Sequence, residues 1–451
     1  MKDLTTGSVG KNILVFATPM LIGQVFQQLY TFVDQIIVGN YLGKEALAAV
    51  GASFPIIFTL IALIIGIASG GTIVISQYFG AKNFFKVKRA IDTLFIMLAG
   101  AAAILTVVGL VFLEDILRLI RLPEELMSLT KNYLSIYISG LILFFAYNAV
   151  AAVLRGMGDS KTPLYFLILS TIINIGLDLL FIVVLGWGIE GAAYATIIAQ
   201  GTAFIVSVIY LDNNHELIRF NIKEFAFDPS IFRQSLKIGL PTGMQHTFVS
   251  LGLLALMGIV NTFGTNVVAA YTAAGRIDAL AVIPAMVFAQ ALSTFVGQNI
   301  GAGKIDRVKR GLWRTLFMTS AVSATMTVII ILFKYPLMRL FTEDAEVIRL
   351  GGEYLTIVTS FYLIFTTMFV FNGVMRGAGD TIIPMFITLF ALWVIRIPAA
   401  YFLSNRLGET GIWWAIPAGW SAGMILAVLY YRVGNWKKKV VARPVPGRQG
   451  N

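Results

Sequence analysis

Two aspartates, Asp34 and Asp178, lie in stretches that are otherwise apolar and long enough to span a membrane. A carboxylate at membrane depth is costly, and such residues usually line a pathway for ions or substrates. Loss of water around a carboxylate and the proximity of a second one both favour the uptake of a proton or another cation. The two residues therefore indicate a transporter with a cation-coupling site.

Other polar residues share a helix face with each aspartate. At helical spacing they are Gln24, Gln27 and Thr31 with Asp34, and Thr171 and Asn174 with Asp178. Two such polar stripes cannot face lipid, so we expect both to point into one helical bundle, toward each other or a water-filled cavity. Their carboxylate, amide and hydroxyl oxygens suit hard cations as well as protons. The alternative is that these groups only hydrogen-bond neighbouring helices to one another.

The composition predicts an all-α polytopic membrane protein. Of 451 residues, 58% are hydrophobic and 13% charged, whereas soluble proteins carry about a quarter charged residues. Uncharged runs of spanning length lie at 12–33, 46–81, 93–113, 132–154, 191–211, 238–275, 279–303, 315–333, 354–375 and 410–431. Two more spans, near 162–184 and 382–405, are interrupted only by Asp178 and Arg396. The predicted number is twelve transmembrane helices.

The basic residues predict the orientation. With a cytoplasmic N-terminus, the inside segments hold about 23 Lys and Arg and the outside segments about eight. We therefore expect both termini in the cytoplasm, no cleaved signal, and residence as a monomer in the cytoplasmic (inner) membrane of a prokaryote. The net charge of +11 is explained by a basic rim facing anionic lipid, so no nucleic-acid partner is expected.

The chain contains an internal repeat. Residues 152–159, AVLRGMGD, match residues 373–380, GVMRGAGD, and Pro163 matches Pro384 at the same offset of 221 residues. Six helices per copy predict two parallel copies related by an axis along the membrane normal. The expected organisation is an N-terminal lobe (1–211), a cytoplasmic linker (212–232), a C-terminal lobe (233–435) and a basic tail (436–451). The lobes would form two pseudo-symmetric six-helix bundles around a central cleft.

These features resemble the multidrug and toxic compound extrusion (MATE) family, and in particular its DinF-like branch. The resemblance rests on the paired loops, on Pro19 in the first helix, on Asp34 together with the NIGLD motif at 174–178, and on GIEGAAYAT at 188–196. It implies a cation site at Asp34, Asn174, Asp178 and Thr196, which would take H⁺ or Na⁺ as coupling ion with no other cofactor. Gln27, Tyr30, Thr31, Tyr133 and Asn148 are expected around it as substrate or cavity residues.

The second copy has no acid at the positions of Asp34 and Asp178, so we expect coupling in the N-terminal lobe alone. Arg396 is either a fixed counter-charge or a paired, buried guanidinium, and Arg276 and Asp278 are assigned to packing or gating. The predicted activity is secondary antiport by alternating access, with export of amphipathic, often cationic, organic compounds. A flippase for lipid-linked oligosaccharide or lipid is the alternative, but such a protein would need a more basic cavity. With two histidines and no cysteine, no enzyme is expected.

Overall fold

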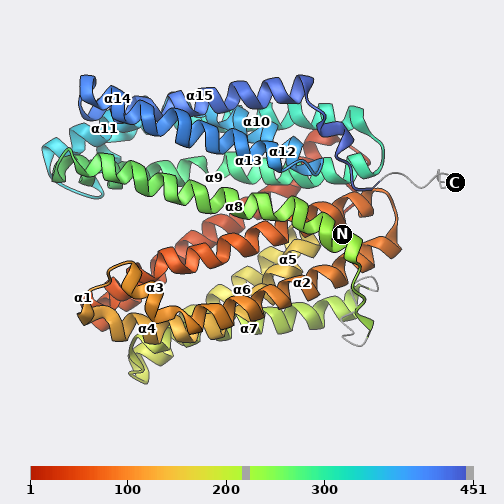
Figure 1. The fold of residues 1–451 in the computed structure, drawn as a ribbon, viewed down its shortest axis with the longest axis horizontal. Helices are drawn as coiled ribbons and strands as arrows, with labels where there is room; N and C mark the ends of the chain where they lie inside the picture. The colour runs from red at the N-terminus through yellow and green to blue at the C-terminus, as the bar shows by residue number, and fades with distance from the viewer. Residues whose placement is uncertain (1, 216–223, 443–451) are drawn as a thin grey trace. The chain divides into compact units, whose positions relative to one another are not determined.

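The computed structural model describes residues 2–215 and 224–442, and all regular structure in these residues is helical (Figure 1). The helices are α1 Val9–Gly80, α2 Phe84–Val111, α3 Leu113–Leu119, α4 Glu124–Ser139, α5 Leu141–Gly156, α6 Lys161–Asp178, α7 Gly188–Asn214, α8 Pro229–Asn261, α9 Thr265–Gly301, α10 Ile305–Arg339, α11 Ala345–Thr359, α12 Tyr362–Gly377, α13 Ile382–Leu389, α14 Ile397–Leu407 and α15 Glu409–Val433. Two π-helical segments, η1 Leu179–Val184 and η4 Phe390–Arg396, and the short 3₁₀ helix η5 Trp436–Lys438 complete the set. Parts of the predicted linker and tail, 216–223 and 443–451, lie outside the described residues.

The described helices confirm an all-α membrane fold. Nine of them are long and apolar enough to cross a membrane, or eleven when each of two bent pairs is one span. Helix α1 has 72 residues and is interrupted by Gly43, whose φ of 83° and ψ of −174° are not helical, so it consists of two arms. The number of twelve spans stays a prediction, because the total depends on how bent and kinked helices are counted.

The internal repeat is present in the backbone as well as in the sequence. Positive φ angles recur 221 residues apart at Gly43 and Gly264 (83° and 89°), at Lys82 and Gly303 (55° and 72°), and at Gly158 and Gly379 (82° and 92°). This conformation is unfavourable for most side chains, which explains the glycines. The bent pairs α4–α5 and α11–α12, with angles of 47° and 48°, follow the same offset. The helices of the two copies are therefore interrupted at equivalent positions.

The chain divides into two compact units. The first comprises Met1–Asp3 and Thr18–Gly243, and the second comprises Leu4–Ala17 and Met244–Asn451. The division at Gly243 lies within α8, after the predicted linker at 212–232, and the start of α1 belongs to the second unit. The predicted lobe boundaries stay a prediction.

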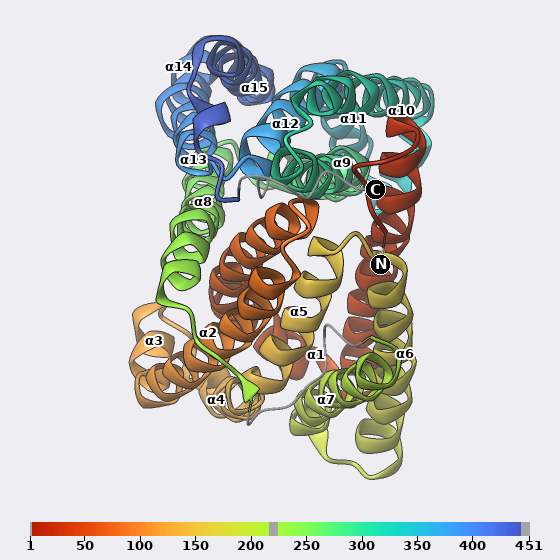
Figure 2. The ribbon, with the colours of Figure 1, turned by 90° about the vertical axis from the view of Figure 1, so that its right-hand side faces the viewer.

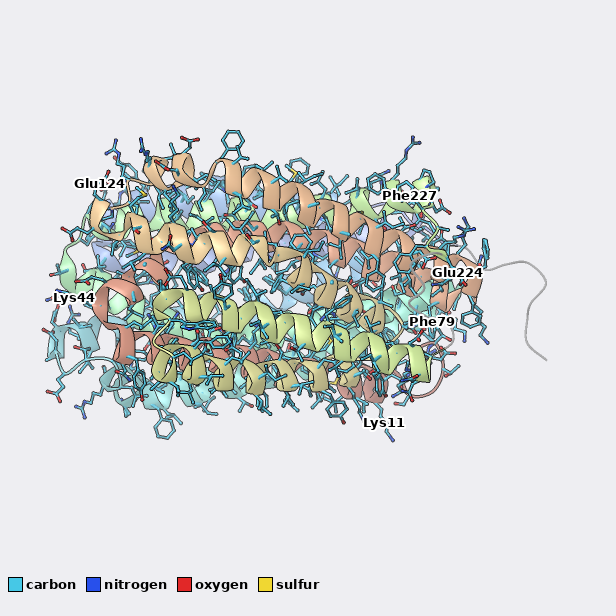
Figure 3. The ribbon with its side chains drawn as sticks, turned by 90° about the horizontal axis from the view of Figure 1, so that it is seen from below. Lys11, Lys44, Phe79, Glu124, Glu224 and Phe227 are labelled. Carbon is cyan, nitrogen blue, oxygen red and sulfur yellow. The ribbon has the colours of Figure 1, made fainter. Side chains whose placement is uncertain are left out.

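Within the first unit, α7 packs against α4, α5 and α6, and α5 packs against α2 (Figure 2). Lys44 and Glu124 lie at one end of this unit, and Phe79, Glu224 and Phe227 lie at the other (Figure 3). The second arm of α1 therefore returns along the bundle after Gly43. Segments that the sequence predicts on one side of the membrane lie at the same end.

Four glycines bring the second arm of α1 against α8. Gly66 and Gly70 on α1 and Gly239 and Gly243 on α8 each have the four-residue spacing that lets membrane helices approach closely. A Cβ atom at Gly70 would lie 2.2 Å from the Ser235 carbonyl oxygen, and one at Gly66 would lie 2.5 Å from the Gly243 nitrogen. The two backbones are therefore in direct contact within the first unit.

At the start of α8, Asp228 accepts hydrogen bonds from the backbone nitrogens of Ser230 (2.9 Å) and Ile231 (3.2 Å), as an N-terminal cap. Lys86 Nζ donates to Asp228 Oδ2 at 2.9 Å. The hydrogen bond from Lys86 lowers the pKa of Asp228, and the backbone bonds add to this effect.

In the second unit, residues Leu4–Gly7 are held by side chains near the end of α9 and the start of α10. Leu4 is fully buried, its nitrogen donates to Gln298 Oε1 at 2.9 Å, and its carbonyl accepts from Arg307 Nη2 at 3.1 Å. Arg307 also donates to the carbonyls of Thr6 (3.0 Å) and Gly7 (2.9 Å). Buried backbone groups need such partners, so these hydrogen bonds hold the residues that precede α1 in place.

Candidate cation-binding site

The two aspartates meet inside the first unit. Asp34 lies on the first arm of α1, and Asp178 is the last residue of α6, directly before the π-helical segment η1. Such segments are rare and occur frequently at functional sites. Asp178 is fully buried, and the carboxyl groups of the two residues hydrogen-bond to each other. The two carboxyl groups therefore form one interacting pair.

Asn174 links the carboxyl pair to α7. Its amide nitrogen donates to Asp178 Oδ2 at 2.9 Å, and its amide oxygen accepts from the Thr196 backbone nitrogen at 3.3 Å. This orientation of the amide follows from its neighbours, since the opposite one would bring acceptor against acceptor. The side chain is 2% exposed. Asn174 therefore fixes the position of Asp178 relative to α7.

Tyrosines form another part of the surroundings. The Tyr30 hydroxyl lies 3.4 Å from Thr196 Oγ1. Tyr133 and Tyr137 on α4 are close enough to Asp34 to interact with it electrostatically, and their rings stack with centroids 6.2 Å apart. The aspartates thus lie among α1, α4, α6 and α7, together with several hydroxyl and amide groups.

Two carboxyl oxygens of this site have no hydrogen-bond partner in the described part of the chain. They are Asp34 Oδ1 and Asp178 Oδ1. Buried acceptors are seldom left unpaired, and a bound cation or a proton would satisfy such oxygens. Across residues 2–215 and 224–442, no group of three or more His, Asp or Glu side chains could hold a metal ion. The donor set thus consists of two carboxylates supplemented by neutral oxygens.

Three of the predicted cavity residues are not joined to the carboxyl pair by the hydrogen bonds of the described chain. Thr31 Oγ1 donates to the Gln27 carbonyl at 3.0 Å, within its own helix, and Asn148 Nδ2 donates to the Phe144 carbonyl at 2.8 Å. The Gln27 side chain is exposed. Their assignment as substrate or cavity residues stays a prediction.

One residue of this site, Tyr137, was not predicted from the sequence. It lies four residues after Tyr133. Residues at this spacing share a helix face, so Tyr137 could have been found by extending the face of Tyr133 by one turn.

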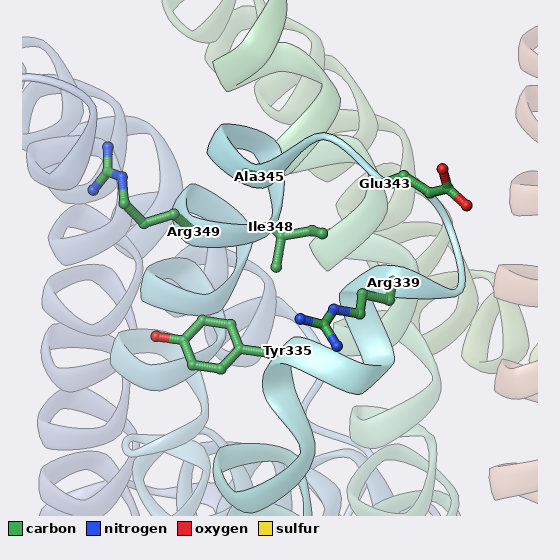
Figure 4. A pocket seen from close by; sticks show the side chains of 6 residues that line it. All are labelled: Tyr335, Arg339, Glu343, Ala345, Ile348 and Arg349. Atoms are coloured by element: carbon green, nitrogen blue, oxygen red, sulfur yellow. The ribbon is translucent and has the colours of Figure 1, made fainter.

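A separate cavity of about 300 Å³ lies in the second unit, at the facing ends of α10 and α11 (Figure 4). It is lined by Tyr335, Arg339, Glu343, Ala345, Ile348 and Arg349. Arg349 forms ion pairs with Glu346 (2.7 Å) and Glu353 (2.5 Å), so its charge is already compensated. None of the predicted site residues lines this cavity.

The chain is similar to known proteins in sequence and in structure. The model of the MatE family matches twice, at residues 19–180 and 241–402, once in each half of the repeat. A probable multidrug resistance protein of Bacillus subtilis (strain 168), YpnP, is 34% identical over 436 residues, which is 96% of this chain and 97% of that protein. A second from the same organism, YoeA, is 33% identical over 447 residues, 97% of this chain and 96% of that protein.

Among solved structures, an outward-facing multidrug resistance MATE family transporter superposes with a TM-score of 0.89 at 26% identity, covering 96% of this chain and 97% of that one. The two-fold match of the family model and the full-length likeness agree with the repeat and the all-helical fold described above. The chain belongs to the MATE family of integral membrane transporters.

Proposed function

We propose that the protein is a secondary antiporter that exports amphipathic, often cationic, organic compounds in exchange for H⁺ or Na⁺. The observation that carries this proposal is the contact between the carboxyl groups of Asp34 and Asp178 inside the first unit. The names of the two Bacillus relatives, both probable multidrug resistance proteins, support a drug as the exported compound. The protein would act by alternating access in the cytoplasmic membrane, with both termini inside.

The coupling follows from electrostatics. With both carboxylates ionised, the pair repels itself in a poorly solvated place, and a bound proton or Na⁺ relieves that repulsion. The unpaired oxygens of Asp34 and Asp178 would bind this cation, and Asn174 and Thr196 would hold the site in shape. Pro19 interrupts the hydrogen bonds of α1 about four turns before Asp34. A change of charge at Asp34 would therefore move an arm of α1 that already bends easily.

The proposal is tested with purified protein in proteoliposomes loaded with a fluorescent organic cation. A proton gradient and a sodium gradient are imposed separately, each with and without an ionophore that collapses it. We expect export of the dye under at least one gradient, and loss of export when that gradient is collapsed. Export that is indifferent to both gradients would contradict antiport.

Replacement of Asn174 by leucine should weaken the coupling ion about 10- to 100-fold, the usual effect of removing a residue that orients an ion ligand. The variant removes the hydrogen bonds that the Asn174 amide forms with Asp178 Oδ2 and with the Thr196 nitrogen. The measurement is the ion concentration that gives half-maximal export. Thr171→Val is the matched control, because Thr171 lies one turn earlier on α6 and its hydroxyl donates to the Leu167 carbonyl of the same helix (2.9 Å). Equal effects of the two variants would contradict the role of Asn174.

A further inference from the structure

The cavity at the facing ends of α10 and α11 contains charged groups that the described chain leaves free (Figure 4). Arg339, the last residue of α10, forms no hydrogen bond or ion pair with the described residues. Its guanidinium points toward Tyr335 and Ile348. The Glu343 carboxylate also has no partner among these residues, and it points away from Arg339. The cavity therefore offers a cation and an anion that do not neutralise each other.

The neighbouring basic groups are already engaged. Arg349 is paired with two glutamates, and Lys334 Nζ donates to Thr356 Oγ1 at 2.8 Å. Over residues 334–353, four acidic side chains stand against three basic ones. This balance does not favour a ligand with a net negative charge, because the excess carboxylate would repel it. A zwitterion, by contrast, can bind to both free charges.

The sequence places this cavity at the depth of the lipid headgroups. The uncharged run of α10 ends at residue 333, and the uncharged run of α11 and α12 begins at residue 354. Each run is long enough to cross the hydrocarbon core, so the residues between them lie just outside it. Tyr335 lies in this layer, and tyrosine is enriched where hydrocarbon meets water.

An apolar stripe continues from the cavity along α10 into the membrane. Four exposed residues at helical spacing share one face of this helix, in the order Val328, Leu332, Tyr335 and Arg339. Leu332 is 70% exposed and Val328 is 56% exposed. Along this face the side chains change from aliphatic to aromatic to cationic. The groups of a phospholipid follow the same order, from acyl chain to phosphate.

Packing between α10 and α11 holds the walls of the cavity. A Cβ atom at Gly352 would lie 2.8 Å from Tyr335 Cε1, and one at Gly351 would lie 2.1 Å from Met338 Cε. The two glycines thus let side chains of α10 lie directly on the backbone of α11. Asp344 caps α11 by accepting hydrogen bonds from two of its backbone nitrogens, at 2.9 and 3.0 Å. A site between packed elements loses little freedom when a ligand binds.

We propose that this cavity binds the headgroup of a phospholipid with a primary amine, such as phosphatidylethanolamine. Arg339 binds the phosphate by charge-assisted hydrogen bonds, and Glu343 binds the ammonium group at the other end of the headgroup. The acyl chains lie along Leu332 and Val328. The inference concerns the lipid around the second unit and does not depend on the proposed export function.

The test measures lipid binding by native mass spectrometry of the purified full-length protein in detergent. Phosphatidylethanolamine, phosphatidylglycerol and phosphatidylcholine with the same acyl chains are added in turn, and we expect phosphatidylethanolamine to bind most tightly. Arg339→Gln should weaken its binding at least about tenfold, because the bonds to the phosphate are lost. Glu343→Gln should bring its affinity to within about twofold of that of phosphatidylglycerol, which has no amine. Both residues are exposed, so neither variant should prevent folding.

Arg406→Gln is the matched control. Arg406 is an exposed arginine in the last turn of α14, it has no partner among the described residues, and it does not line the cavity. Its replacement should leave the binding of phosphatidylethanolamine within about twofold. Glycerophosphoethanolamine, the headgroup without acyl chains, should not displace the lipid at equal concentration. Equal effects of the two arginine variants, tighter binding of phosphatidylglycerol, or displacement by the soluble headgroup would overturn the inference.

Discussion

Asp178→Asn will abolish ion-driven export while the protein still folds and binds substrate. Asparagine preserves the size of the side chain but cannot lose a proton, so the group that the ion would neutralise is no longer charged. Its contact with Asp34 can persist as an ordinary hydrogen bond, which is why we expect little loss of stability. The measurement is dye export from proteoliposomes under the gradient that drives the unaltered protein, and we expect the rate of empty liposomes.

The control for this variant is Asp115→Asn. Asp115 is an exposed acid of the short helix α3, so this substitution removes the same charge at a position outside the carboxyl pair. Equilibrium binding of the dye to both variants separates coupling from substrate recognition. Export by Asp178→Asn at the rate of the control would remove the carboxyl pair from the mechanism.

Gly70→Leu will destabilise the first unit severely. The new Cβ would lie 2.2 Å from the Ser235 carbonyl oxygen and 2.8 Å from the Gly239 nitrogen, and both are backbone atoms that cannot rotate away. Overpacking usually costs about 1–3 kcal/mol, and a clash with the backbone of a second helix belongs at or above the upper end of that range. We expect the thermal unfolding temperature in detergent to fall by at least about 5–10 °C, or the protein to be lost during purification.

Gly100→Leu provides the comparison. Gly100 is an exposed residue of α2, and a Cβ there meets no atom within 4 Å. Both variants add the same side chain to a membrane helix, so helix propensity and hydrophobicity cancel between them. Similar unfolding temperatures for the two variants would show that the contact between α1 and α8 does not limit stability.

Those residues of the site that lie on the same helix could be predicted from the sequence. Asn174 and Asp178 are four residues apart, and helical periodicity alone places them on one face. The contacts of Thr196 and Tyr133 with this pair depend on how α4 and α7 pack, and the sequence contains no local signal for that. Those two residues came from the resemblance to a family, and Tyr137, which that resemblance did not include, was missed.

In the fold, too, local features could be predicted from the sequence and contacts between distant segments could not. The repeat was visible because matching loops recur at one offset, and the positive φ angles at Gly158 and Gly379 explain why those loops keep their glycines. The close contact of Gly66 and Gly239 could not be singled out, because the chain has 42 glycines and many have no such neighbour. Nor does any local pattern indicate that Leu4–Ala17 belongs to the second unit, since its partners Gln298 and Arg307 lie some 300 residues away in sequence.

The distance in sequence between Leu4 and its partners affects the order in which these contacts form during biosynthesis. The hydrogen bond between Leu4 and Gln298 joins residues 294 positions apart. At a synthesis rate of about 5–20 residues per second, the first residues wait roughly 15–60 s for their partners to leave the ribosome. During this interval the carbonyl groups of Leu4–Gly7 have none of the contacts that Arg307 later provides. The first residues to be made are thus among the last to reach their final place, and a nascent chain that stalls before α10 would carry them unprotected.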